Sequence, residues 1–160
     1  MIITKTPFRI SFFGGGSDYP EHYLCHGGCV LATSINKYCY ISFRKLPPFF
    51  DYKFRLSYSV IETTQKISEI QHPAIKGVLD YLNVTDGIEL HHVGDLPARS
   101  GLGSSSSFTN GLLHAVHTFL GNEVSQYDLA IQAIEVEQKK IKEILGSQDQ
   151  VISAVGGLNK

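Results

Sequence analysis

The chain has 160 residues, of which 42% are hydrophobic and 18% charged, a balance typical of one folded domain and not of a disordered chain. Its 14 basic and 15 acidic side chains nearly cancel, so the overall charge does not indicate a nucleic-acid or membrane-surface partner. No apolar run reaches the roughly 20 residues that cross a bilayer, and the first residues lack the pattern of a signal peptide. We therefore expect a cytoplasmic protein.

The N-terminal half has the composition and alternation of β-strands. Residues 7–13, 29–35 and 37–44 are rich in apolar and aromatic side chains, and each segment predicts a strand. Residues 54–60 alternate apolar and polar side chains most regularly and predict a half-buried strand. Together these segments predict a sheet.

Helical spacing dominates the second half of the chain. Apolar residues after a proline predict a short helix over about 73–82, and residues 88–93 are typical of a further strand. Apolar side chains within residues 108–119 recur at helical spacing and predict a helix. A capping pattern at Ser125 predicts a last helix that ends near residue 145. Strands first and long helices later favour an α+β fold with helices packed on one face of the sheet.

The three cysteines form an odd set that is not typical of a disulfide framework, so we interpret them as thiols. Cys25 and Cys29 lie close in sequence to His22 and His26, a combination that could indicate zinc. No second ligand pair follows at the spacing of a zinc finger or ribbon. We interpret this cluster as buried or partly buried side chains beside a glycine pair, and the role of Cys25, Cys29 and His26 stays open.

The segment LPARSGLGSSSSF, residues 96–108, joins the predicted strand to the predicted helix. A glycine-rich turn before a helix offers unpaired backbone N–H groups and the positive end of the helix dipole to an anion such as phosphate. It is not a Walker A sequence, because no lysine follows Gly103, and Ser106 stands where the dinucleotide fingerprint needs its third glycine. The alternative is a flexible surface turn whose serines cap the helix.

A second glycine-rich segment, PFRISFFGGGSDY, ends a predicted strand with Gly14 to Gly16, between Arg9 and Asp18. Three glycines let the backbone approach a ligand closely, and the flanking charges could hold sugar hydroxyls or a phosphate. The alternative is a tight turn with an exposed ion pair.

Two carboxylates stand out near the C-terminus. Glu137 falls inside the apolar stripe of the last predicted helix, where an unpaired charge is costly. A magnesium ion would satisfy it, as would a core arginine or a helix tilted toward solvent. Asp149, within SQDQ, either caps a short helix or receives a proton from a substrate hydroxyl.

The order and spacing of these stretches resemble the GHMP kinases, the family of galactokinase, homoserine kinase, mevalonate kinase and phosphomevalonate kinase. LPARSGLGSSSSF resembles the family's Pro-x-x-x-Gly-Leu-Gly-Ser-Ser phosphate loop, and PFRISFFGGGSDY its N-terminal substrate motif. EVEQKKIKEILGSQDQ is similar to the segment that supplies a magnesium-binding Glu and then a catalytic Asp. GGGSD, GGCVLATSI and GSQDQ most resemble the family's sugar kinases that phosphorylate the anomeric hydroxyl of D-glycero-D-manno-heptose 7-phosphate.

The resemblance implies a role for each matching residue. Asp149 would receive or orient the attacking hydroxyl, Arg9 would stabilise charge at the reacting oxygens, and Ser105 with Glu137 would bind Mg²⁺. The ATP-binding residues would be Pro97, Gly101, Leu102, Gly103, Ser104, Ser105 and Ser106. The residues that contact the sugar would be Arg9, Gly14, Gly15, Gly16, Ser17 and Asp18.

The resemblance also implies an architecture. Residues 1–160 would form the N-terminal, ATP-binding lobe, whose fold is similar to domains of the translation machinery, and a C-terminal lobe would be absent from this chain. We therefore expect a fragment that alone binds nucleotide weakly and turns over poorly or not at all. No nucleic-acid or membrane partner is implied.

The acceptor is the less determined part of the prediction. Galactokinases have Glu and His where this chain has Gly15 and Gly16, which argues against galactose and leaves room for a phosphorylated sugar. Alternatives are another small acceptor such as galactose, fucose or mevalonate, or a non-catalytic module that binds nucleotide or sugar phosphate. Candidates for holding a sugar phosphate are Lys37, Arg44, Lys53, Arg55 and Arg99.

Overall fold

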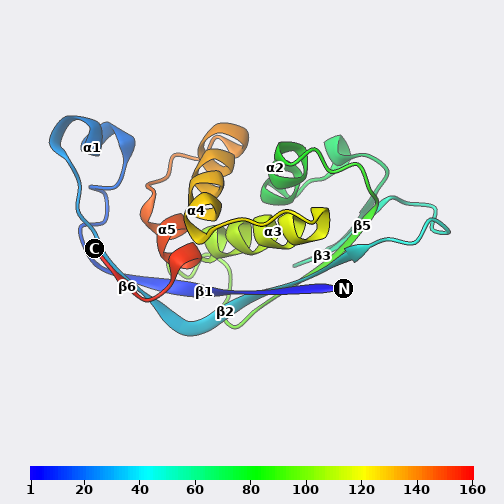
Figure 1. Cartoon of the computed structure of the whole chain (residues 1–160), viewed down its shortest axis with the longest axis horizontal. Coiled ribbons are helices and arrows are strands. Elements are labelled where there is room, and N and C mark those ends of the chain that lie inside the picture. Colours follow the sequence, from blue (N-terminus) through cyan, green and yellow to red (C-terminus); the bar gives the residue numbers. More distant parts are fainter.

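A six-stranded sheet forms one layer of the molecule, and the helices α2 to α5 lie together on one of its faces (Figure 1). The computed structural model describes all residues, 1–160. The strands are β1 (Ile2–Phe13), β2 (Leu31–Lys45), β3 (Phe54–Ser57), β4 (Ile61–Thr64), β5 (Ile88–Gly94) and β6 (Leu158–Asn159). The helices are α1 (Pro20–His26), α2 (Pro73–Tyr81), α3 (Ser104–Leu120), α4 (Gln126–Glu135) and α5 (Gln148–Val155), with a 3-10 turn at Ile67–Glu69 and a π-helical segment at Val136–Ile141. This arrangement confirms the α+β prediction.

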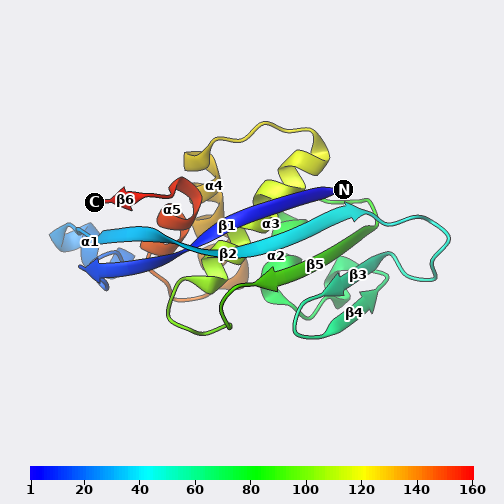
Figure 2. The same cartoon turned by 90° about the horizontal axis from the view of Figure 1, so that it is seen from below.

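The sheet has the strand order β1-β2-β5-β3-β4, and β6 pairs with β2 beyond the end of β5. Neighbouring strands are antiparallel except β3 and β5, which are parallel. Figure 2 shows the face that the helices leave uncovered. On that face the carboxylate of Glu89 binds Arg44 and Arg55 from the two strands beside it.

The core lies between the sheet and the helices. Alternate residues of β2, namely Cys39, Ile41 and Phe43, are buried because successive side chains of a strand point to opposite faces. They pack in one cluster of 22 buried residues that includes Leu112 and Val116 of α3. Burial raises the pKa of the Cys39 thiol to about 12, so this cysteine is a neutral core side chain. None of the helices combines the length and apolar character needed to cross a bilayer.

Several predicted boundaries differ from the structure. The two strands predicted over 29–35 and 37–44 form one long strand, β2, which begins at Leu31 and follows β1 through two register shifts instead of stopping. The alternation over 54–60 spans a strand and a turn, because the Tyr58 N–H bonds the Val60 carbonyl and the chain returns as β4. α1 and β4 had no predicted counterpart. The short helix considered at Asp149 is α5, but Ser147 and not Asp149 occupies its N-cap position, so the capping alternative for Asp149 is wrong.

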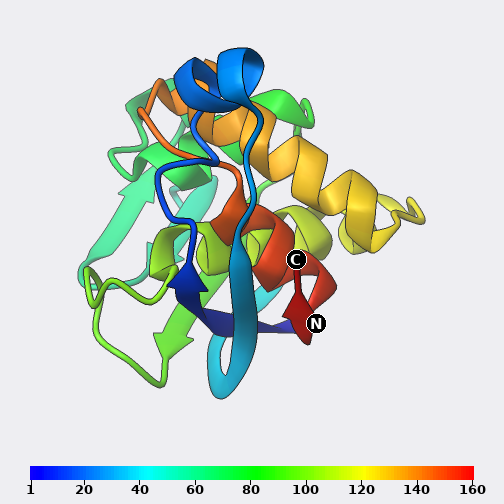
Figure 3. The ribbon, with the colours of Figure 1, turned by 90° about the vertical axis from the view of Figure 1, so that its left-hand side faces the viewer.

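The last long helix ends earlier than predicted. It changes to a π-helical segment at Val136 and stops at Lys142, whose φ of 61° is left-handed. Ile144 lies beyond this end, in the loop, and is exposed, so the predicted apolar stripe does not extend to it. The loop from Lys142 to Ser147 then leads into α5, which lies beside the start of β6 (Figure 3).

Candidate active site

The loop between β5 and α3 presents free backbone donors at a helix N-terminus. Gly101 and Gly103 adopt left-handed φ angles of 75° and 74°, which a glycine tolerates without strain. The first helical bond of α3 joins the Ser107 N–H to the Gly103 carbonyl at 2.9 Å, so the N–H groups of the three preceding serines have no backbone acceptor. Such a terminus is suited to binding phosphate oxygens.

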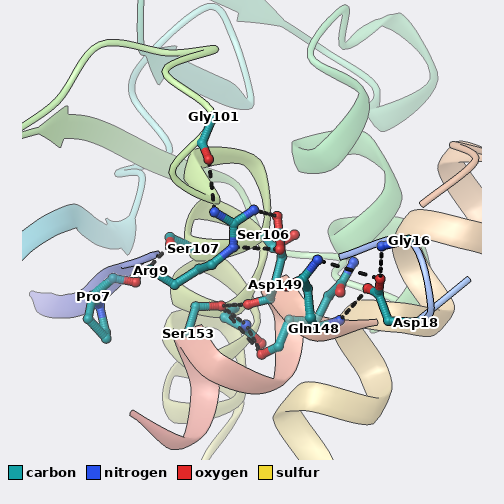
Figure 4. Close-up of polar contacts among 12 residues, drawn as sticks. Pro7, Arg9, Gly16, Asp18, Gly101, Ser106, Ser107, Gln148, Asp149 and Ser153 are labelled. Atoms are coloured by element: carbon teal, nitrogen blue, oxygen red, sulfur yellow. Dashed lines mark hydrogen bonds and ion pairs between the residues drawn. The ribbon is translucent and has the colours of Figure 1, made fainter. Parts of the chain in front are cut away.

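Arg9 of β1 joins this loop to Asp149 of α5 (Figure 4). Its Nε lies 2.6 Å from Oδ1 of Asp149 and its Nη2 2.7 Å from Oδ2, a two-point ion pair. Nη1 donates to the Gly101 carbonyl at 2.8 Å, and the Arg9 backbone N–H donates to the Leu102 carbonyl at 3.0 Å. A Cβ on Gly103 would lie 2.9 Å from Cγ of Arg9, so the loop packs directly on this side chain.

Glu137 is fully buried behind the loop, with no cationic partner among the ion pairs. The Ser106 hydroxyl donates to Oε2 at 3.0 Å and Nε2 of Gln150 donates to the same oxygen, whereas Oε1 has no hydrogen-bond partner. Burial raises the pKa of this carboxyl. The two alternatives for satisfying the charge of Glu137, pairing with a core arginine and exposure to solvent, are therefore wrong.

A buried carboxylate with a free oxygen beside a seryl hydroxyl and a helix N-terminus with free N–H groups fits Mg²⁺. This ion prefers oxygen ligands, and it is usually held by one or two carboxylates together with substrate phosphates and water. The contact with Glu137 comes from Ser106, not from the predicted Ser105, which is exposed. Consecutive residues of a helix point about 100° apart, so only one of them can face Glu137.

The glycine-rich segment after β1 is tied to its surroundings by hydrogen bonds. The Ser17 hydroxyl donates to the Gly14 carbonyl at 2.7 Å and contacts both polar backbone groups of Cys29. A Cβ on Gly14 would overlap the Cys29 carbonyl, so only glycine fits at this position. The segment therefore packs on the chain before β2, and its proposed contact with a sugar stays a prediction.

Asp18 is buried and connects this segment to α5. Its Oδ1 accepts the Gly16 N–H at 3.0 Å, and its Oδ2 accepts the Gln148 N–H at 3.1 Å. Arg9 pairs with Asp149 and not with Asp18, so the predicted alternative of an exposed ion pair within this motif is wrong. Binding of sugar hydroxyls by Asp18 stays a prediction.

Comparison with known proteins identifies the family. The family model described as the GHMP kinases N terminal domain matches residues 67–157. The chain belongs to the GHMP kinase family. The glycine-rich loop before α3, Glu137 and Asp149 all lie inside the matched region.

Individual GHMP kinases resemble the whole chain. A D-glycero-alpha-D-manno-heptose 7-phosphate kinase of Campylobacter jejuni is 29% identical over 99% of this chain and 49% of its own length. A crystal structure of a D-glycero-D-manno-heptose 1-phosphate kinase from Bacteroides thetaiotaomicron superposes with a TM-score of 0.88 at 26% identity, over 99% of this chain and 55% of that one. Lactococcus lactis galactokinase, at 23% identity and a TM-score of 0.70 over 94% of this chain and 42% of that one, shares the fold. The chain spans about half the length of these relatives.

Within this GHMP kinase domain, the structure adds polar residues that the sequence analysis did not assign. Asn110 of α3 donates from Nδ2 to the Gln150 carbonyl at 2.8 Å and to the Ser153 hydroxyl at 2.6 Å. Gln150 is fully buried and holds Glu137. The signals available were the glutamines of SQDQ and an asparagine four residues after Ser106, but neutral carboxamides carry no distinctive spacing.

Two of the candidate cations for a sugar phosphate, and the cluster of cysteines and histidines, lie elsewhere in this GHMP kinase domain. Arg44 and Arg55 are engaged by Glu89 on the helix-free face, so they are not free for a sugar phosphate. No group of three or more His, Cys, Asp or Glu side chains could hold a metal. Cys25, Cys29, His22 and His26 are all exposed, because they lie in and after the short α1 away from the core, so the interpretation of this cluster as buried or partly buried side chains is wrong. A cavity of about 840 Å³ borders Asp18 and Gln148 and also contacts Cys29.

Proposed function

We propose that the chain forms the nucleotide-binding part of an ATP-dependent sugar kinase that phosphorylates the anomeric hydroxyl of a heptose 7-phosphate. The observation that carries the proposal is the fully buried Glu137, whose Oε1 has no partner directly behind a helix N-terminus with free N–H groups. An unpaired buried carboxylate destabilises a fold unless a cation binds it. This arrangement supports a site for a triphosphate with its divalent ion.

The residues of the site suit phosphoryl transfer. The N–H groups of Ser104, Ser105 and Ser106 would hold phosphate oxygens at the positive end of α3. Glu137 and the Ser106 hydroxyl would hold Mg²⁺, which neutralises charge on the phosphates when bound. Ser105, which is exposed at the loop, is left as a phosphate ligand and as the alternative seryl ligand of the ion.

Asp149 and Arg9 would act on the acceptor. Asp149 would orient the attacking hydroxyl and take its proton, and a carboxylate of ordinary basicity suffices because that proton leaves late in a loose transition state. In the structure both carboxylate oxygens of Asp149 bind Arg9, so an acceptor hydroxyl would share the carboxylate with the guanidinium. Arg9 would then stabilise the charge that develops between the two substrates.

The proposed class of acceptor is supported by the relatives and by the open space at Gly16. The Campylobacter jejuni relative is named a heptose 7-phosphate kinase. A Cβ on Gly15 would contact the side chains of Gln148 and Ser11 at 3.6 and 3.9 Å, whereas Gly16 has nothing within 4 Å, so the open space for a bulky substrate lies at Gly16. A second, C-terminal lobe would complete the sugar site, in keeping with a chain that spans half of its relatives.

Phosphoryl transfer by the two-lobed protein, assayed as coupled ATP-to-ADP turnover with heptose 7-phosphate, tests the proposal. Asp149→Asn should reduce turnover at least about 1,000-fold, while the affinity for Mg²⁺ with the non-hydrolysable analogue AMP-PNP stays within about twofold. Equal loss of binding and turnover, or no turnover in the unmodified protein with any sugar phosphate, supports a binding module instead. Full turnover by the 160-residue chain alone contradicts the two-lobe proposal.

A further inference from the structure

Gln150 lies in a fully buried position between the two acidic residues of the candidate site. It follows Asp149 in α5, and its side chain is directed to Glu137 in the π-helical segment. Its exposed fraction is 0%, equal to that of Glu137. Its Nε2 donates to Glu137 whereas its own Oε1 has no hydrogen-bond partner, so the contact to Glu137 is the one that indicates what the side chain does.

The carboxamide determines which oxygen of Glu137 is occupied. Nε2 of Gln150 and the hydroxyl of Ser106 both donate to Oε2, whereas Oε1 has no hydrogen-bond partner. The Thr109 hydroxyl lies close enough to lower the pKa of Glu137, but it donates to the Ser105 carbonyl at 3.2 Å. Two donors on one oxygen fix the plane of the carboxylate and leave the other oxygen available to a ligand. Because the donor is neutral, the carboxylate keeps the full charge that attracts a cation, which a lysine or arginine at this position would cancel.

The backbone of Gln150 is held as firmly as its side chain. Its carbonyl accepts from Asn110 at 2.8 Å, and Asn110 also donates to Ser153. The Ser153 hydroxyl in turn donates to the Asp149 carbonyl at 2.6 Å (Figure 4). Asn110 lies one helical turn after Ser106 on α3. The first turn of α5 is therefore fastened to the helix that follows the phosphate loop.

We propose that Gln150 is a positioning residue of the metal site: it holds Glu137 by Oε2, presents Oε1 to the divalent ion, and fixes this carboxylate relative to the neighbouring Asp149. This inference rests on the proposed function. It assigns no contact between Gln150 and the substrates. Outer partners of metal ligands commonly change metal affinity by about 10- to 100-fold when they are removed.

Calorimetric titration of AMP-PNP into the full 160-residue chain, with and without MgCl₂, tests the inference. The magnesium ratio is the dissociation constant without MgCl₂ divided by the dissociation constant with MgCl₂. It isolates the contribution of the ion to binding. Gln150→Leu should lower this ratio by about 10- to 100-fold and leave the metal-free dissociation constant within about twofold. In the Glu137→Gln background, Gln150→Leu should cause no further change, because the two residues act through one ligand.

Gln132→Leu provides the matched control. Gln132 is a glutamine of α4 whose Oε1 lies 2.7 Å from Nε2 of His117, away from Glu137, so its loss should leave the magnesium ratio unchanged. If Gln150→Leu does not fold by circular dichroism, Gln150→Met keeps the length of the side chain without its donor and carries the same expectation.

The outcomes separate the two proposals. A magnesium ratio that Gln150→Leu and Gln150→Met leave unchanged overturns the inference while the proposed function stands. An equal fall in Gln132→Leu also overturns it, because the effect is then one of general destabilisation. If the unmodified chain binds AMP-PNP equally with and without magnesium, the metal site itself is contradicted and the inference falls with it.

Discussion

Gly146 occupies a position where a single methyl group should break the junction between the glycine-rich segment and α5. A Cβ on Gly146 would overlap Oδ2 and Cγ of Asp18 and lie 2.8 Å from Oδ1. Gly146 has no positive φ, so Gly146→Ala introduces a steric clash without backbone strain. The carboxylate of Asp18 would have to leave the N–H groups of Gly16 and Gln148, which it accepts at 3.0 and 3.1 Å.

The magnitude follows from these two bonds. A hydrogen bond to a charged group contributes about 1.5 to 3 kcal/mol, so losing both while the carboxylate regains partial hydration should lower the free energy of unfolding by about 3 kcal/mol. Gly15→Ala is the control, since its Cβ would find nothing nearer than 3.6 Å and its φ is not positive. That change should stay within about 1 kcal/mol of the unmodified protein.

Urea denaturation followed by tyrosine fluorescence measures both variants, because the chain has 8 tyrosines and no tryptophan. The midpoint of Gly146→Ala should fall well below that of Gly15→Ala at an unchanged slope. Equal midpoints for the two variants would show that Asp18 is not fixed at Gly146 as described, and the junction would have to be reconsidered.

Three further changes have defined outcomes. Burial raises the pKa of Glu137, so as the pH rises above 4.5 the unfolded chain loses this proton first and the folded state is destabilised. Glu137→Gln should therefore raise the metal-free free energy of unfolding, measured by urea denaturation, by about 1 to 3 kcal/mol at neutral pH but not at pH 4. Burial opposes ionisation of Glu89 as well, but hydrogen bonds from Arg44 and Arg55 outweigh it and lower the pKa of Glu89. The stability that this carboxylate contributes is therefore lost as the pH falls below 4.5. Glu89→Gln should lower the free energy of unfolding by about 1 to 2 kcal/mol at neutral pH and make it less dependent on pH. Gly103→Ala should weaken AMP-PNP binding about tenfold in calorimetry, since the left-handed φ costs about 1 to 2 kcal/mol; unchanged affinity contradicts the loop geometry.

The sequence predicted the parts of the site that depend on local pattern. A strand, a glycine turn and a helix follow from spacing alone, and so does the conflict between the charge of Glu137 and its apolar neighbours. The structure resolves that conflict with neutral donors, Ser106 and Gln150, and with an oxygen left free.

The remainder depended on information that a local pattern does not contain. Whether Ser105 or Ser106 faces Glu137 depends on the rotation of α3 against α4, which tertiary packing determines. The end of the last helix depends on a π-helical segment with no compositional signal, and the turn at Tyr58 continues the alternation of β3 so that one strand was predicted where a hairpin forms.

A crystal structure of the chain grown with AMP-PNP and Mn²⁺, in which anomalous scattering locates the metal, tests whether Glu137 and the loop before α3 form one triphosphate site. We expect a manganese peak about 2.0 to 2.2 Å from Oε1 of Glu137, with the phosphates at the N–H groups of Ser104 to Ser106. A metal and triphosphate bound elsewhere, with Oε1 of Glu137 still without a ligand, would contradict the assignment of this site.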